Sequence, residues 1–267
     1  MDTTIYNETY ITVLTGQKPS TKTYVIKDGV AQKGEVIKPS YLYNYVTNSI
    51  NNINDLYDII YKTSLKDNSI IIRGRSQYKQ DWYRTRTIKK DNEGTFTEHP
   101  TAWLCIDFDN QIVPGIERLS LAAIEWLINN NLPEVFHNSS YIYQWSSSAG
   151  LEYNNIPIKN GTNVHLFFYL DKGLVETELK GWFSNIEQSV IDKSVFQTVQ
   201  PIFINANVNK DERIIDLIPL KDKIGIVHKN NPVVQTPEEI ELTKYRERHS
   251  TAKSIDVDSA NEIVQKL

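Results

Sequence analysis

Alternating apolar and polar positions predict two long strands in the middle of the chain. In the run Trp103–Asp109, every second side chain is apolar, and Asp107 and Asp109 share the opposite face. The run Val164–Leu170 alternates in the same way, with His165 opposite its aliphatic row. Both runs are typical of strands with one buried face, so the two acids and the histidine are expected on rigid elements.

Further runs predict a sheet that is covered by helices. The other strand-like runs are Tyr10–Leu14, Tyr24–Ile26, Ser69–Arg73, Tyr141–Trp145 and Pro201–Ile204. Apolar residues at helical spacing predict helices near Ile53–Tyr61, over Ile116–Leu127 and over Leu179–Val190. Because strands and helices alternate through the middle of the chain, helices packed on a sheet are the expected arrangement.

The pattern changes near residue 236. Thr236-Pro237-Glu238-Glu239 has the capping hydroxyl, the proline and the acids of a helix start, and residues 244–253 are charged and poorly patterned. We therefore expect one domain over residues 1–235, with an N-terminal α/β portion of about 1–100 and a core of about 101–235. Residues 236–267 are expected to be a helical tail or a linker to a further domain.

The composition is that of a globular protein in a reducing compartment. Of the 267 residues, 40% are hydrophobic and 23% are charged, and the single cysteine rules out a disulfide framework or a cysteine-based zinc finger. No apolar run is long enough to span a membrane, and the N-terminus does not resemble a signal peptide. We expect a cytoplasmic location. The net charge of −4 argues against a protein that coats nucleic acid over its whole surface.

One stretch is nevertheless strongly basic. Between Arg73 and Lys90 there are seven cationic residues and one acid, with Tyr78, Trp82 and Tyr83 among them. Cations that hold phosphates and aromatic rings that stack on bases are what a single strand requires of its binding surface. A solvated basic hairpin is the alternative interpretation of the same stretch.

Three acids and a serine-rich loop supply candidate chemistry. Asp107 and Asp109 offer hard oxygen ligands for Mg²⁺ or Mn²⁺, although a strand end or a turn can carry the same pair. Asp192, at the end of a predicted helix, would complete a two-metal cluster if it converged on them. The small residues of 146–150 leave backbone N–H groups open to phosphate oxygens, and His165 could meet the same phosphates.

The order of these pieces resembles the three motifs of the archaeo-eukaryotic primase superfamily, in particular the primase-polymerases of phages and plasmids. The similar segments are Ile71-Ile72-Arg73-Gly74, Trp103 before Asp107-Phe108-Asp109, Ser146-Ser147-Ser148-Ala149-Gly150 before Val164-His165-Leu166-Phe167-Phe168, and Asp192 before Val199-Gln200-Pro201-Ile202-Phe203. The resemblance covers roughly Thr12 to Arg213. Each motif is short, and only their ordered combination is specific.

The resemblance implies roles for individual residues. The implied metal ligands and catalytic residues are Asp107, Asp109 and Asp192, the implied nucleotide-binding residues are Ser147, Ser148, Lys159, His165 and Arg213, and the template-binding residues are Arg73, Arg75, Arg84, Arg86 and Lys89. The chain departs from the family where a basic residue often precedes the motif histidine, because Thr162 and Asn163 stand there and Lys159 is the nearest cation. No zinc is expected.

The resemblance also implies a fold and an activity. The fold would be α+β, with an RRM-like mixed or antiparallel central sheet that carries the acids in its middle, flanked by helices. The activity would be template-directed synthesis of DNA or RNA primers on single-stranded DNA by two-metal nucleotidyl transfer from NTPs or dNTPs. We expect a monomer in the cytoplasm of a bacterium or a phage-infected host, with a replicative helicase fused or acting in trans.

Two other functions fit the same residues. A hydrophobic strand that ends in Asp-x-Asp also opens phosphatases of the haloacid dehalogenase type, although Gln111 stands where those enzymes usually have Thr or Val. A single-strand or origin DNA-binding module with non-catalytic acids would bind DNA without a metal ion.

Overall fold

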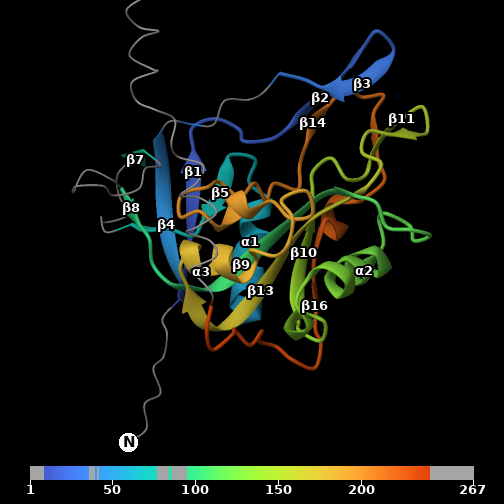
Figure 1. Cartoon of the computed structure of the whole chain (residues 1–267). Helices are drawn as coiled ribbons and strands as arrows, with labels where there is room; N and C mark the ends of the chain where they lie inside the picture. The colour runs from blue at the N-terminus through green and yellow to red at the C-terminus, as the bar shows by residue number, and fades with distance from the viewer. Residues whose placement is uncertain (1–8, 36–39, 41, 77–83, 86–94, 241–267) are drawn as a thin grey trace, which may run out of the picture.

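Two four-stranded antiparallel sheets form the body of the molecule (Figure 1). The computed structural model describes residues 9–35, 40, 42–76, 84–85 and 95–240. The first sheet has the order β5-β1-β4-β7, and its strands are β1 (Thr9–Gly16), β4 (Leu42–Ile50), β5 (Ser69–Ile72) and β7 (Arg84–Thr85). The second has the order β16-β10-β13-β9, and its strands are β9 (Thr101–Gln111), β10 (Tyr141–Trp145), β13 (Thr162–Leu174) and β16 (Ile224–Val227). An α+β fold with antiparallel sheets is thereby confirmed.

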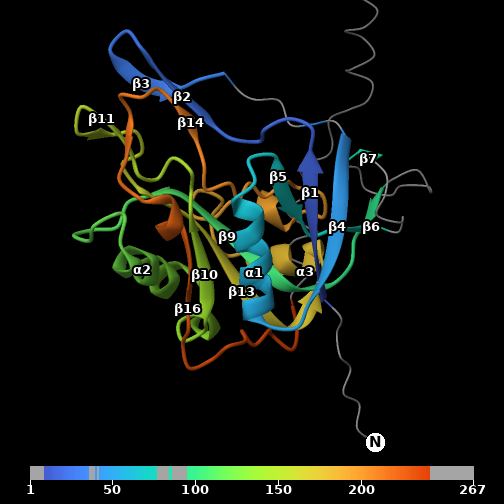
Figure 2. The ribbon, with the colours of Figure 1, turned by 180° about the vertical axis from the view of Figure 1, so that it is seen from behind.

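Helix α1 (Ile53–Ser64) lies between the two sheets, as the views from both sides show (Figures 1 and 2). Its N-terminus is capped by Asn52, whose side chain accepts the N–H groups of residues 54 and 55. Ile53, Leu56 and Ile60 are buried on one stripe, and the helix contacts strands of both sheets. One amphipathic helix therefore supplies core to both sheets.

The sheets also touch directly. The N–H of Ala102 donates to Thr9 Oγ1 at 2.7 Å, and Trp103 Nε1 donates to the carbonyl of Tyr10 at 2.8 Å. These bonds join the start of β9 to β1, and Trp103 is fully buried at the junction. Buried residues of both sheets belong to one continuous apolar cluster.

Short elements complete the fold. The remaining helices are α2 (Leu121–Asn131) and α3 (Glu176–Trp182), with 3-10 turns η1 (Glu134–Phe136), η2 (Lys193–Phe196) and η3 (Leu220–Asp222). The remaining strands are β2 (Thr23–Lys27), β3 (Val30–Lys33), β6 (Arg75–Ser76), β8 (Phe96–Thr97), β11 (Leu151–Tyr153), β12 (Ile156–Pro157), β14 (Asn209–Lys210) and β15 (Ile215–Asp216). Strand β14 pairs parallel with β2. No described helix is both long enough and apolar enough to cross a membrane.

Several sequence expectations need correction. Strand β9 with its acids is the edge of the described sheet and not its middle. Residues 201–204 make only an isolated bridge between Ile71 and Ile202. The helix expected over 179–190 ends at Trp182, and the one expected from Ile116 begins at Leu121, where the hydroxyl of Ser120 caps it.

The expected helix start at Thr236 is also absent from the described part of the tail, residues 236–240. Both the N–H and the hydroxyl of Thr236 bond instead to Asp171 Oδ1, at 3.0 and 2.7 Å. These bonds fasten Thr236 to β13, and the rest of the predicted tail lies outside the described residues.

Candidate active site

The pairing of β9 with β13 places Asp107 directly across from His165. Side chains that oppose each other on neighbouring antiparallel strands lie within contact distance. His165 Nε2 is 3.3 Å from Asp107 Oδ1, and both side chains are mostly buried. The predicted convergence of these two motifs is therefore a consequence of strand register.

A third strand fixes the imidazole ring. Gln144 on β10 opposes His165, and its Oε1 is 2.6 Å from His165 Nδ1. The amide orientation follows from the Gln144 Nε2 bond to the carbonyl of Trp145, so Oε1 is the acceptor for His165 Nδ1–H. A ring with protons on both nitrogens can donate to Gln144 and Asp107 at once.

The Asp107 carboxylate lies in a positive environment. Burial alone would raise its pKa, but the charge and hydrogen bond of His165 and the charges of Lys22 and Lys159 outweigh that effect, so the pKa is lowered. The carboxylate is therefore ionised at neutral pH. An ionised, partly desolvated carboxylate is a strong ligand for a hard cation.

Replacing His165 with alanine should raise the pKa of Asp107. The variant loses the largest stabilising charge and the hydrogen bond, and the desolvation of the carboxylate then has less to oppose it. Carboxyl chemical shifts in an NMR titration would measure the change. An Asp107 that titrates at the same pH in both proteins would contradict the ion pair.

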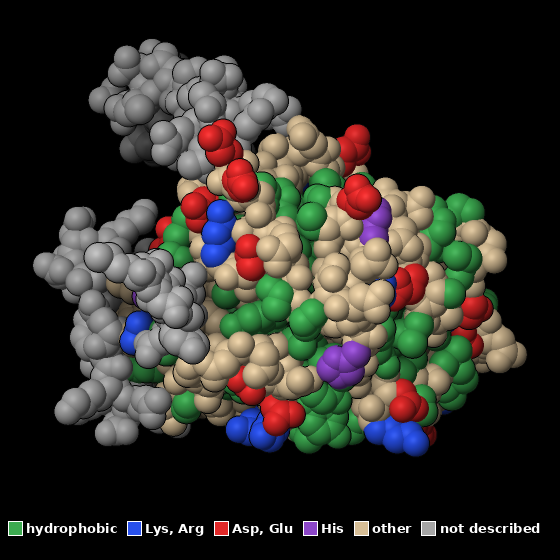
Figure 3. Space-filling view, turned by 90° about the horizontal axis from the view of Figure 1, so that it is seen from below, with side chains coloured by type: hydrophobic (Ala, Val, Ile, Leu, Met, Phe, Trp, Pro, Cys, Tyr) green, Lys and Arg blue, Asp and Glu red, His purple; other side chains and the backbone are tan. Residues whose placement is uncertain are grey.

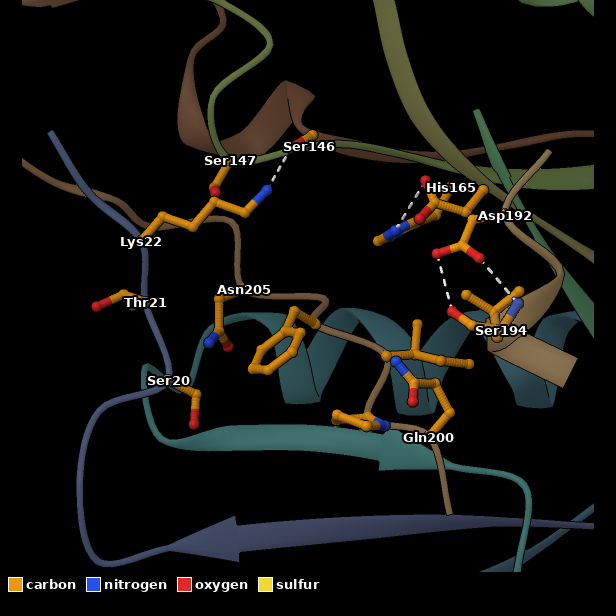
Figure 4. Close-up of a pocket in the computed structure, with 15 residues that line it drawn as sticks. Ser20, Thr21, Lys22, Ser146, Ser147, His165, Asp192, Ser194, Gln200 and Asn205 are labelled. Atoms are coloured by element: carbon orange, nitrogen blue, oxygen red, sulfur yellow. Dashed lines mark hydrogen bonds and ion pairs between the residues drawn. The ribbon is translucent and has the colours of Figure 1, made fainter. Parts of the chain in front are cut away.

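Asp192 is held next to Asp107 by a backbone hydrogen bond. Its N–H donates to the carbonyl of Asp107 at 3.1 Å, which fastens the start of η2 along the open edge of β9. Its carboxylate accepts from the N–H and hydroxyl of Ser194, at 2.9 and 2.8 Å, and from Gln188 Nε2 at 2.8 Å. The acid expected at a helix end is thus the N-cap of a short turn that lines the cleft (Figure 4).

Asp109 points into a neighbouring hollow. Its side chain is 67% exposed and pairs with Lys159 Nζ at 3.3 Å. This contact brings together a predicted metal ligand and the nearest cation before the motif histidine. Asp107 and Asp109 follow the same face of β9, as period-two alternation predicted.

These side chains line one cleft with two lobes. Each lobe has a volume of about 210 Å³, and both are lined by Lys22, Asp107, Ser146 and His165. Asp192 and Ser147 belong to the first lobe, and Asp109 and Lys159 to the second. Together the lobes fall in the usual size range of small-molecule sites, roughly 300–1,000 Å³.

The serine loop contributes to the cleft unevenly. Ser146 and Ser147 line it, whereas Ser148 is 1% exposed and its hydroxyl lies 3.3 Å from that of Ser146. The predicted contact of Ser148 with a nucleotide therefore has no support from its position. Gly150 closes the loop where a Cβ atom would lie only 2.5 Å from Asp216 Oδ1, so a side chain does not fit there.

Lys22 is a site residue that sequence reasoning missed. It follows β1 in a loop that carries no motif, yet its Nζ donates to Ser146 Oγ at 3.2 Å across the cleft (Figure 4). Desolvation lowers its pKa, partly offset by the charges of Asp107 and Asp109, although the residue as a whole reaches solvent at the mouth of the cleft. No local pattern identifies it, because its partner is 124 residues away.

The predicted template surface is only partly described. Arg73 is 4% exposed and donates to Thr101 Oγ1 and to the carbonyl of Leu174, so the prediction that it contacts a template is wrong. Arg75 lies over the ring of Tyr10 at 4.1 Å. Arg84 belongs to β7, whereas Arg86 and Lys89 lie outside the described residues. On the face shown in Figure 3, acidic and basic side chains of the described residues are interspersed.

Arg213 is not among the described residues that line the cleft. Its guanidinium pairs with Asp211 at 2.9 Å, and the resulting hydrogen bonds lower the pKa of Asp211 to about 2. Arg213 lines neither lobe. Its predicted contact with a nucleotide therefore has no support from its position.

The donor set fits a magnesium or manganese ion by its chemistry. Asp107 and Asp192 both line the first lobe and carry carboxylate oxygens, and the described cleft lining contains one histidine and no cysteine, which disfavours zinc. Each acid is held by a protein donor, and no group of three or more potential ligands in a metal-binding arrangement occurs among the described residues. A bound ion would have to take the place of contacts from Ser194, His165 or Lys159.

Comparisons of the chain with protein-family models, with curated proteins and with solved structures gave no match.

Proposed function

We propose that this chain is a template-directed nucleotidyltransferase, a primase-polymerase that makes or extends primers on single-stranded DNA. The observation that carries the proposal is the common cleft of Asp107, His165 and Asp192, three residues from separate motifs. Lys22 and the serine loop add positive charge and hydroxyls to that cleft. In this cleft the carboxylates could hold a metal ion, and the positive charge and hydroxyls could bind the anionic ligand that accompanies it.

Different residues of the cleft would have different roles in the reaction. A metal pair held by Asp107, Asp109 and Asp192 would lower the pKa of the attacking hydroxyl and neutralise charge on the departing pyrophosphate. His165, whose ring Gln144 orients through Nδ1, would donate from Nε2 to phosphate oxygens once a metal ion takes the Asp107 carboxylate from it. Lys22 would neutralise the outer phosphates, and Ser146 would donate its hydroxyl to them. Lys22 thus supplies the cation that is missing immediately before the motif histidine.

The test is incubation with single-stranded DNA, labelled NTPs or dNTPs and Mg²⁺ or Mn²⁺, with and without an annealed primer. Metal-dependent products identify a polymerase, and products without a primer identify a primase. Strand binding without products under every condition would favour the DNA-binding module. One observation favours that alternative, because protein donors already contact all three carboxylates. Release of phosphate from a simple phosphomonoester would instead favour the phosphatase.

The double replacement Arg84→Ala with Arg86→Ala should weaken binding of single-stranded DNA. Each lost phosphate contact reduces the slope of log affinity against log salt concentration by about 0.7. Fluorescence anisotropy of a labelled oligonucleotide at several salt concentrations would measure both effects. Lys62→Ala, on the exposed side of α1, serves as the control. Unchanged affinity and slope would place the template groove elsewhere.

A further inference from the structure

Two buried polar atoms at one end of the cleft have no hydrogen-bond partner within the described structure. They are Ser20 Oγ and Asn205 Oδ1, in residues that are 8% and 4% exposed. Both residues line the first lobe, on the side opposite Asp192 and His165 (Figure 4). A buried polar atom without a partner destabilises the folded state, so such atoms call for a partner.

One carbonyl group holds both residues in place. The carbonyl of Asp67 accepts the backbone N–H of Ser20 at 2.6 Å and Nδ2 of Asn205 at 3.2 Å. The second bond fixes the orientation of the amide, because Nδ2 must face Asp67. The atom that Asn205 leaves free is therefore its oxygen, which is an acceptor only.

The free atoms define the chemistry of the missing partner. Asn205 Oδ1 requires a donor, and Ser20 Oγ can accept or donate, so hydroxyl groups of a ligand can bond to both atoms. An ionised phosphate or carboxylate cannot donate to Asn205 and would be repelled by its oxygen. Lys22, Ser146 and His165 lie at the other end of the lobe, where an anion is favoured. The lobe therefore suits a molecule that is anionic at one end and carries hydroxyls at the other.

We propose that Ser20 and Asn205 bind the sugar hydroxyls of a nucleoside triphosphate whose phosphates lie against Lys22, Ser146 and His165. The inference rests on the proposed function and adds the contact that senses the sugar. The half-buried Phe203 lines the same lobe and offers an apolar surface for the sugar or the base. The contact would make the enzyme sensitive to the 2′- or 3′-hydroxyl of its substrate.

Binding of ATP, dATP and ddATP to the full chain, with Ca²⁺ in place of Mg²⁺, tests the proposal by calorimetry. We expect ddATP to bind about tenfold more weakly than ATP, because it leaves the buried acceptor unpaired. A loss already seen with dATP assigns the contact to the 2′-hydroxyl, and a loss seen first with ddATP assigns it to the 3′-hydroxyl. In Asn205→Ala, which removes that acceptor, the difference between ATP and ddATP should shrink to about twofold or less.

Inorganic tripolyphosphate controls for misfolding of the variants. Its affinity should be the same in wild type and Asn205→Ala, because it engages only the cationic end. Asn130→Ala, on the exposed side of α2, should leave the whole series unchanged. Equal affinity of wild type for ATP and ddATP would overturn the sugar contact while leaving the nucleotide site intact. Failure of every nucleotide to bind would overturn both proposals.

Discussion

Replacing Asp107 with asparagine should reduce nucleotide incorporation by at least about a hundredfold. Replacing a residue that only orients a metal ligand costs about 10- to 100-fold in metal affinity or activity, and loss of a ligand itself should cost more. The substitution removes the charge on the one acid that borders both lobes of the cleft. It keeps the shape of the side chain, and the bond from Asp192 N–H goes to the backbone carbonyl of residue 107, which is unaffected. Incorporation of labelled nucleotide into a primed template measures the loss.

Two further substitutions make the result specific. Asp109→Ala should also abolish synthesis while it largely spares DNA binding, because its carboxylate reaches the second lobe of the same cleft. Asp58→Asn, on the exposed side of α1, should leave synthesis unchanged. An Asp107→Asn protein with wild-type synthesis would remove the metal-ligand assignment and with it the proposed mechanism.

The strands that carry the site were predictable because their signal is local. Period-two alternation placed Asp107 and Asp109 on one face of β9 and His165 on the polar face of β13, and the structure confirms both strands. The order of strands in the sheet has no such local signal. Strand β9 is at the described edge because η2 lies along its open side, and that contact joins residues far apart in sequence.

The errors also have physical causes. Apolar spacing continues past Trp182 because Ile186 and Val190 still pack against the core, although the backbone there forms turns. Lys22 and the Ser20–Asn205 pair carry no motif, and long-range contacts alone bring them to the cleft. Arg73 was predicted at a surface from its charge, yet its side chain is buried between the two sheets against Thr101 and Leu174.

Replacing Asp216 with alanine should lower the free energy of unfolding by about 3–5 kcal/mol, the usual cost of leaving one buried charge without its partner. Lys223 is the charge concerned. Its side chain is 1% exposed, and its Nζ lies 2.8 Å from Asp216 Oδ2 and 3.3 Å from the carbonyl of Ser147. The pair therefore also anchors the serine loop of the cleft. Urea unfolding at neutral pH measures the effect.

The companion variant Lys223→Met should cost less, because the Asp216 carboxylate that it leaves behind is 19% exposed and can reach water. The double variant should recover much of the stability lost by Asp216→Ala, since no unpaired buried charge remains. If Asp216→Ala and Lys223→Met cost the same and their effects add in the double variant, the two side chains are not coupled.

The pH dependence of the same variants gives an independent check. Desolvation lowers the pKa of Lys223 below the ordinary lysine value of 10.5, and the bond and charge of Asp216 oppose that shift. A lysine whose folded pKa lies below its unfolded pKa binds fewer protons in the folded state, so unfolding free energy rises with pH between the two values. In Asp216→Ala the folded pKa falls further and this window widens. The free energy of unfolding that Asp216→Ala loses relative to wild type should therefore be largest at neutral pH, and the loss should shrink as the pH approaches 10. A deficit that is the same at pH 7 and at pH 9.5 would mean that Lys223 does not carry the buried charge.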